Sequence, residues 1–169
     1  CYLSKGLAMY ESLKDHSENF HLYIFPFNNQ ALYILNKLQL SHVTVIPLAN
    51  FETKELLEVK KDRTNAEYCW TSTPSIISYV LEKYDIPFCT YIDADLYFYS
   101  DPSVLIEEMN SKNKSVLITE HRFSFLPKLY EEKRGGRFCV QFVTFKNESE
   151  SIQVLDRWKN QCIEWCYAR

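Results

Sequence analysis

Hydrophobic and polar residues follow two spacings along this chain, one typical of helices and one typical of strands. A spacing of three or four residues predicts amphipathic helices over 3–14, 31–38, 51–59, 74–84 and 147–167. Short apolar or alternating runs predict strands over 20–27, 43–46, 88–92, 115–119 and 138–145. The Asp101–Pro102 pair predicts the start of a further helix, and the polar residues 60–68 predict a loop.

The predicted helix over 74–84 has a start signal of its own. Thr73 is a good N-cap residue, and Pro74 suits the first position of a helix. The free N–H groups at such a helix start can meet a phosphate or a ribose, which makes Thr71 and Thr73 candidate ligands of an anionic group. Plain helix capping is the alternative.

The order of the predicted elements favours one fold class. Strands that alternate with helices need crossover connections, which predicts an α/β fold with a mostly parallel, open sheet and helices on both faces. A length of 169 residues suits one compact domain, so we expect residues 1–169 to form a single domain.

The composition narrows the possible functions. With 46% hydrophobic and 24% charged residues and a net charge of −3, the chain is typical of a globular protein. A sequence pI of about 5.8 argues against nonspecific binding of nucleic acid.

No apolar run approaches the ~18 residues of a transmembrane segment. No signal peptide is recognisable, so we expect a cytoplasmic protein with reduced cysteines.

The predicted strand over 88–92 delivers two carboxylates at its C-terminal end, where open α/β sheets place their ligand sites. Side chains alternate along an extended segment, so Asp93 and Asp95 are expected to point to the same side. Two carboxylates so placed repel each other unless a cation lies between them or one is protonated. Mg²⁺ or Mn²⁺ resolves that conflict, because these ions take one or two carboxylates together with substrate phosphates.

The run Tyr91–Asp95, followed by Phe98 and Asp101–Pro102, resembles the DxD signature of nucleotide-diphospho-sugar transferases with the Rossmann-like, A-type glycosyltransferase fold. Similar chains have a helix start like Tyr2–Ala8 (YLSKGLA) and a later strand like Val140–Phe145 (VQFVTF). The likeness covers most of the chain. That family normally has a first strand before this helix and acidic or His residues after its final helix. Neither is visible here, so we expect the domain to lack a first strand and a C-terminal segment.

The resemblance implies a metal-dependent glycosyltransferase that moves a sugar from a UDP- or GDP-sugar to an acceptor that the sequence does not identify. It implies Mn²⁺ or Mg²⁺ at Asp93 and Asp95, bridging the diphosphate of the donor and neutralising the charge of the leaving group. The donor is expected to contact six residues: Thr71, Thr73, Asp93, Ala94, His121 and Gln141. No catalytic base is assigned, so retaining and inverting transfer both stay open.

Several other residues have two interpretations each. His121 follows a strand and is expected on the same rim as the two aspartates, where it either contacts donor or acceptor or is an exposed loop residue. The basic stretch 122–137 is either a lid over a phosphate or a solvated loop. Residues Tyr97–Tyr99 either wall an acceptor site or serve packing. Lys5, near the start of the first predicted helix, is either solvated or phosphate-binding, and we expect it to be solvated.

Two alternatives belong to other classes of protein. A phosphatase of the haloacid-dehalogenase type also uses a DxD at a strand end, but that motif requires Thr or Val two residues after its second Asp, where this chain has Tyr97. The second alternative is a catalytically incomplete domain that binds a sugar nucleotide or a partner protein. A donor-hydrolysis assay separates this alternative from an enzyme.

Overall fold

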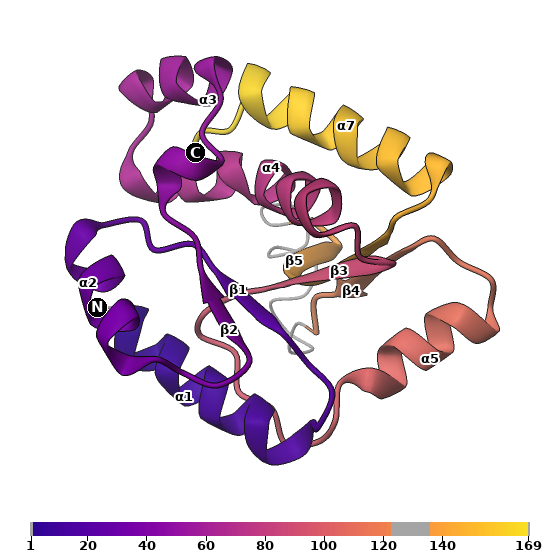
Figure 1. Cartoon of the computed structure of the whole chain (residues 1–169). Helices are drawn as coiled ribbons and strands as arrows, with labels where there is room; N and C mark the ends of the chain where they lie inside the picture. The colour runs from indigo at the N-terminus through magenta and orange to yellow at the C-terminus, as the bar shows by residue number, and fades with distance from the viewer. Residues whose placement is uncertain (1, 123–135, 169) are drawn as a thin grey trace. The chain divides into compact units, whose positions relative to one another are not determined.

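The structure is a computed structural model that describes residues 2–122 and 136–168 (Figure 1). The chain divides into two compact units, each built from two stretches of sequence. Unit 1 comprises Cys1–Ser17 and Phe88–Lys146, and unit 2 comprises Glu18–Pro87 and Asn147–Arg169. The single domain expected from the chain length stays a prediction.

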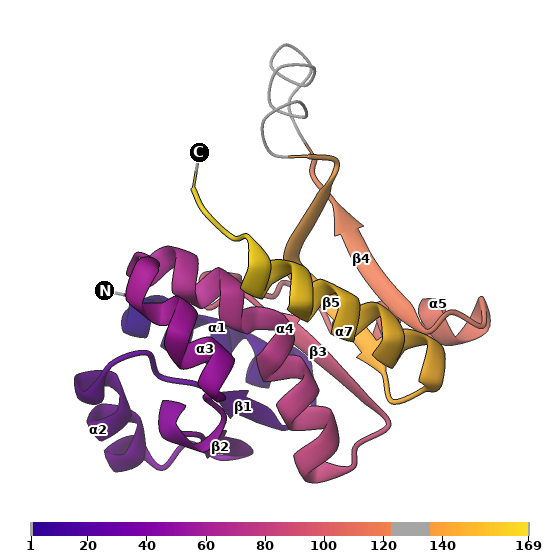
Figure 2. The ribbon, with the colours of Figure 1, turned by 90° about the horizontal axis from the view of Figure 1, so that it is seen from above.

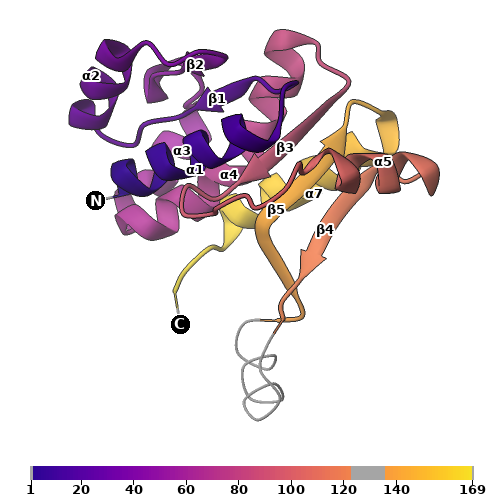
Figure 3. The same ribbon diagram turned by 90° about the horizontal axis from the view of Figure 1, so that it is seen from below.

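In its described residues, unit 1 has a three-stranded sheet and two helices. Its elements are α1 (Tyr2–His16), β3 (Phe88–Ile92), α5 (Ser103–Ser111), β4 (Val116–Glu120) and β5 (Phe138–Lys146). The strand order is β3-β5-β4, and β5 pairs antiparallel with both neighbours, as Figure 3 shows. Ile92 of β3 lies opposite Phe142, and Glu120 of β4 lies opposite Phe138. Strand β4 therefore ends beside the first residue of β5, and β3 ends beside its middle.

Unit 2 contains a parallel strand pair and most of the helices. Its elements are β1 (Leu22–Ile24), α2 (Asn29–Leu38), β2 (Val43–Val45), α3 (Lys54–Val59), α4 (Asn65–Tyr84) and α7 (Ser149–Glu164), with 3-10 turns η1 (Leu48–Asn50) and η2 (Lys60–Asp62). Strands β1 and β2 are parallel, as their connection through α2 requires. Helices α4 and α7 lie side by side in Figures 1 and 2.

The core of unit 2 is aromatic. Phe51, Leu56 and Tyr68 are buried together, and partly buried side chains pack against them: Phe25, Phe27, Leu48, Ile76, Tyr79 and Ile163. The rings of Phe25 and Phe51 meet edge to face with their centroids 5.2 Å apart. Such pairs stabilise a core beyond the apolar area that they bury.

The start of α4 differs from the prediction. The helix begins at Asn65, so the predicted loop over 60–68 is wrong in its last residues, and the predicted start at Thr73–Pro74 is wrong. Thr64 is the N-cap, and it forms a capping box with Glu67. Pro74 lies inside the helix, nine residues after its first residue, where it removes one backbone N–H.

The α/β class predicted from the sequence is confirmed, whereas the mostly parallel open sheet is wrong for the described part of the chain. That part contains one parallel pair and one antiparallel three-stranded sheet. The crossover argument holds only for strands joined through a helix, as β1 and β2 are. The sequence predicts a polar stretch and no helix between the strands now seen as β4 and β5, and such strands are free to pair antiparallel.

Candidate functional site

The two predicted aspartates lie in unit 1, directly after β3. The sheet continues one residue beyond this strand, because the Asp93 amide donates to the Gln141 carbonyl of β5 at 3.0 Å. The Leu96 amide then donates to the Asp93 carbonyl at 3.2 Å, which closes a four-residue turn. The expected extended backbone is therefore wrong at this point, because Ala94 and Asp95 lie in the turn.

Each carboxylate has one polar partner. The Tyr91 hydroxyl donates to Asp93 Oδ1 at 2.8 Å, and Lys5 Nζ donates to Asp95 Oδ2 at 3.3 Å. The second oxygens, Asp93 Oδ2 and Asp95 Oδ1, have no hydrogen-bond partner within residues 2–122 and 136–168. One oxygen of each carboxylate is thus available to a ligand.

Helix α1 is held against the turn that carries these carboxylates. Gly6 faces Ala94 so closely that a Cβ on the glycine would lie 3.7 Å from the Ala94 Cβ. Further along the helix, the buried Ser12 hydroxyl donates to the Met9 carbonyl at 2.8 Å and accepts from the Phe98 amide at 3.0 Å. These contacts place the side chain of Lys5 beside Asp95.

The segment after the turn leads into α5, and the Asp101 carboxylate in this segment accepts a hydrogen bond. The Ser103 amide donates to Asp101 Oδ1 at 2.9 Å and lowers the pKa of this carboxyl. The predicted helix start at Asp101–Pro102 is confirmed, since α5 begins at Ser103 with Pro102 as its N-cap residue.

The sheet brings two further predicted residues to the same end of unit 1. Gln141 is exposed, and its carbonyl accepts the Asp93 amide. His121 is half-buried directly after β4, and its amide donates to the Arg137 carbonyl at 2.9 Å. Strand β3 ends opposite Phe142 and β4 ends opposite Phe138, and the β4–β5 register shifts between Ile118 and Thr119. His121 and Asp93 therefore share one rim of the sheet.

Thr71 and Thr73 lie in unit 2, inside α4 rather than at a helix start. Both are buried, and their hydroxyls donate to the carbonyls of Glu67 and Cys69, one turn earlier, at 2.8 and 3.1 Å. The helix N-terminus that suggested a phosphate or ribose contact is absent at these residues.

The remaining predicted residues have these positions. Ala94 is exposed in the turn. Tyr97 and Tyr99 are exposed, and their ring centroids lie 5.0 Å apart. Most of the basic stretch 122–137 lies outside the described residues, so neither of its interpretations is tested.

Sequence reasoning did not identify Lys5 or Tyr91 as neighbours of the aspartates. Lys5, expected to be solvated, is half-exposed and forms an ion pair with Asp95. Tyr91 had a usable signal, because residues two apart on a strand share a face. Lys5 had none, since its partner is 90 positions away in sequence.

The donor set suits a hard cation better than a soft one. The described part of the chain contains no group of three or more His, Cys, Asp or Glu that could hold a metal ion. Burial raises the pKa of the Cys89 thiol in β3 to about 12, so this cysteine is a neutral thiol at physiological pH. Carboxylate oxygens are the available ligands, and these suit Mg²⁺ or Mn²⁺.

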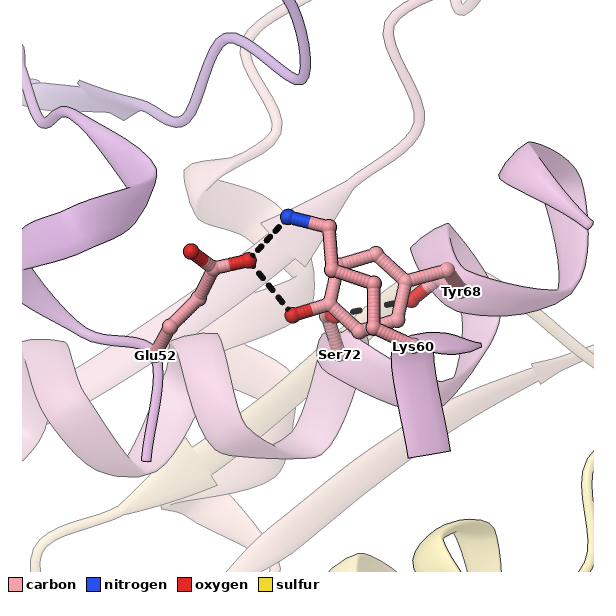
Figure 4. Close-up of polar contacts among 4 residues, drawn as sticks. All are labelled: Glu52, Lys60, Tyr68 and Ser72. Carbon is pink, nitrogen blue, oxygen red and sulfur yellow. Dashed lines mark hydrogen bonds and ion pairs between the residues drawn. The ribbon is translucent and has the colours of Figure 1, made fainter. Parts of the chain in front are cut away.

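Unit 2 holds a separate buried polar cluster, drawn in Figure 4. The Glu52 side chain is only 9% exposed, and its Oε1 accepts from the Tyr68 hydroxyl at 2.7 Å and from Lys60 Nζ at 2.6 Å. The Lys60 ammonium lies 4.9 Å from the centroid of the Tyr68 ring, and Ser72 donates to the Tyr68 carbonyl. The cluster joins the segment around α3 to α4, which is a structural role.

No helix among residues 2–122 and 136–168 is long and apolar enough to cross a membrane. The cytoplasmic location expected from the sequence stays a prediction.

Two curated proteins of Bacillus subtilis (strain 168) are similar to this chain. The uncharacterized protein YfnD is 35% identical over 166 residues, which cover 98% of this chain and 52% of YfnD. The uncharacterized protein YfnF is 31% identical over 176 residues, which cover 97% of this chain and 57% of YfnF. The chain thus spans about half the length of the curated relatives it matches. No family model and no solved structure matches the chain.

Proposed function

We propose that this chain is part of a metal-dependent glycosyltransferase that transfers a sugar from a UDP- or GDP-sugar. The observation that carries the proposal is the pair Asp93 and Asp95 at the end of β3, each with one partnered oxygen and one oxygen available to a ligand. The resemblance of the surrounding residues to the DxD signature supports the same function.

The two carboxylates fit a divalent cation of the Mn²⁺ or Mg²⁺ type. Asp93 and Asp95 would hold it, and phosphate oxygens and water would complete its coordination, since these ions need few protein ligands when a diphosphate is present. Such an ion stabilises the negative charge that develops on the leaving diphosphate when the glycosidic bond breaks.

The rim around the two aspartates offers contacts for the rest of the donor. Ala94 and the side chain of Gln141 are exposed beside Asp93, and His121 lies at the end of the neighbouring outer strand. Gln141 offers both donors and an acceptor for sugar hydroxyls, and His121 offers one of each when neutral. We assign Thr71 and Thr73 to the structure of α4 instead, because their hydroxyls are buried on helix carbonyls.

A second candidate is a domain that binds the sugar nucleotide without turning it over alone. The chain spans about half of its curated relatives, and residues for an acceptor site or a catalytic base can come from the other half of such a protein. A binding assay and a donor-hydrolysis assay on the same sample distinguish the two candidates.

The test is a calorimetric titration of UDP, GDP and their sugar conjugates in the presence of Mn²⁺ and again with a chelator. We expect one nucleotide to bind only with Mn²⁺, and the variant Asp93→Asn/Asp95→Asn to lose at least tenfold in affinity. The matched control is Asp15→Asn/Asp62→Asn, which removes the same charge from two exposed aspartates outside the site. Equal losses in both double variants, or binding insensitive to the chelator, would contradict the proposal.

A further inference from the structure

We propose that Lys5 is the resident counter-ion of this site: it competes with a divalent cation for Asp95 and, once displaced, binds the diphosphate of the donor. This inference rests on the proposed function and assigns a role to a residue outside the DxD signature. It explains how the charge of Asp95 is balanced when no divalent cation is bound.

The position of Lys5 follows from the packing of α1. The helix is fixed to the turn by the Gly6–Ala94 contact and by the Phe98 amide bonded to the buried Ser12 hydroxyl. Lys5 Nζ lies 3.3 Å from Asp95 Oδ2 and 4.9 Å from the centroid of the Tyr2 ring. Its ammonium therefore has both an anionic and an aromatic neighbour at the edge of the site.

The Lys5–Asp95 ion pair is weak enough for another cation to displace Lys5. The two side chains are 56% and 41% exposed, and pairs of this kind change an equilibrium by a factor of only about 1.4 to 5. A divalent cation at Asp95 brings twice the charge of the ammonium and repels it. Replacing Lys5 by the metal at Asp95 therefore costs little binding energy.

The displaced ammonium then has a clear alternative partner. A lysine carries three N–H donors on a flexible four-carbon stem and binds phosphate as a point charge. A diphosphate bound to a cation at Asp93 and Asp95 still carries negative charge beside α1. Lys5 supplies a second positive charge to this group without any movement of the helix.

Lys14 provides a matched control on the same helix. It also forms an ion pair with a carboxylate, Glu11, at 3.4 Å, and its ammonium also lies near an aromatic ring, that of Tyr10, at 5.9 Å. The two lysines are about equally exposed. Only Lys5 is paired with an aspartate of the candidate site.

The experiment compares Lys5→Met with Lys14→Met in two titrations, one with Mn²⁺ alone and one with UDP, GDP or inorganic pyrophosphate at saturating Mn²⁺. We expect Lys5→Met to bind Mn²⁺ about threefold more tightly than Lys14→Met, because the competitor for Asp95 is gone. We expect it to bind the diphosphate about tenfold more weakly, because a charged hydrogen bond is lost. Lys5→Arg should retain both properties within a few fold.

The outcomes separate this inference from the proposed function. If Asp95→Asn binds Mn²⁺ as tightly as the unchanged chain does, the cation site itself is refuted. If Asp95→Asn loses Mn²⁺ but Lys5→Met matches Lys14→Met in either titration, the role of Lys5 alone is overturned. A preference for nucleoside diphosphates over pyrophosphate identifies the nucleotide, rather than free diphosphate, as the ligand.

Discussion

The hydroxyl of Tyr91 donates a hydrogen bond to Asp93 Oδ1 across 2.8 Å, so one oxygen of this carboxylate is fixed by its own strand. The two residues are two positions apart at the end of β3, where the strand geometry puts them on one face. Oriented carboxylates hold cations better than free ones, because partners of this kind fix the ligand atoms in place.

We therefore expect Tyr91→Phe to weaken Mn²⁺ binding by about tenfold, the lower end of what loss of such a partner costs. Electron paramagnetic resonance of Mn²⁺ measures this affinity directly. Tyr99→Phe serves as the control, because its ring is 84% exposed and lies in the same segment of unit 1. Unchanged Mn²⁺ affinity in Tyr91→Phe would show that the hydroxyl does not support the site.

The contact between Gly6 and Ala94 limits the size of the side chain that position 6 can hold. A Cβ at this position would make ordinary contact with Ala94 at 3.7 Å, and alanine favours a helix interior over glycine by roughly 0.5–1 kcal/mol. Gly6→Ala should therefore slow hydrogen exchange of the α1 amides and preserve Mn²⁺ binding. Gly6→Leu should speed that exchange and weaken Mn²⁺ binding, because its larger side chain must displace the turn. Equal behaviour of the two variants would contradict the close packing.

The capping box predicts the stability of α4. Thr64 Oγ1 accepts from the Glu67 amide, and its hydroxyl and amide both donate to Glu67 Oε2 at 2.8 Å. Thr64→Ala should lower the free energy of unfolding of unit 2 by about 1 kcal/mol in a urea titration. Thr64→Ser keeps the hydroxyl and should recover most of this loss. A helix that truly began at Thr73 would be insensitive to both substitutions.

We expect the protein to lose stability at alkaline pH when the Tyr68 phenol ionises. Burial, together with the hydrogen bond to the Glu52 carboxylate, raises the pKa of this phenol well above its usual value near 10. Since the folded pKa is the higher one, the stabilisation is complete below pH about 10. Above that pH, the free energy of unfolding falls by at most ~1.4 kcal/mol per pH unit for this group.

Urea titrations of unit 2 between pH about 9 and about 11 measure that slope. Tyr68→Phe should be less stable at neutral pH, since Glu52 loses a donor, and should show a shallower decline above pH about 10. Tyr84→Phe is the comparison, because burial also raises the pKa of Tyr84 but no carboxylate bond accompanies it among the described contacts. Parallel curves for Tyr68→Phe and the unchanged chain would contradict this assignment.

Local patterns predicted most of the elements, and they failed where a distant residue decided the outcome. The strand at Phe88–Ile92 has the predicted bounds, because a short apolar run before two aspartates leaves little choice. Pro74 suggested a helix start because proline is common there, whereas the Thr64–Glu67 box starts the helix at Asn65, nine residues before Pro74. The position of a proline alone does not distinguish a helix start from a helix interior.

The sequence indicated the two carboxylates of the candidate site but not the backbone structure around them. Asp93 and Asp95 were identifiable because two carboxylates close together after an apolar strand repel each other unless a cation lies between them. The turn between them was not, since it depends on the backbone bond from Leu96 to Asp93. The direction of β5 was also not predictable, because a strand that follows a polar stretch can pair either way.

The contacts of α1 have a consequence for the order in which the chain acquires its structure during synthesis. The partners of Lys5 and Ser12 lie 90 and 86 positions later in the chain. At ~5–20 residues per second, the ribosome needs roughly 5–20 s to produce them. An isolated helix of 15 residues is marginal in water, so α1 spends this interval largely unfolded with its apolar side chains exposed. Helix α1 can make these native contacts only after Asp95 and Phe98 have been synthesised.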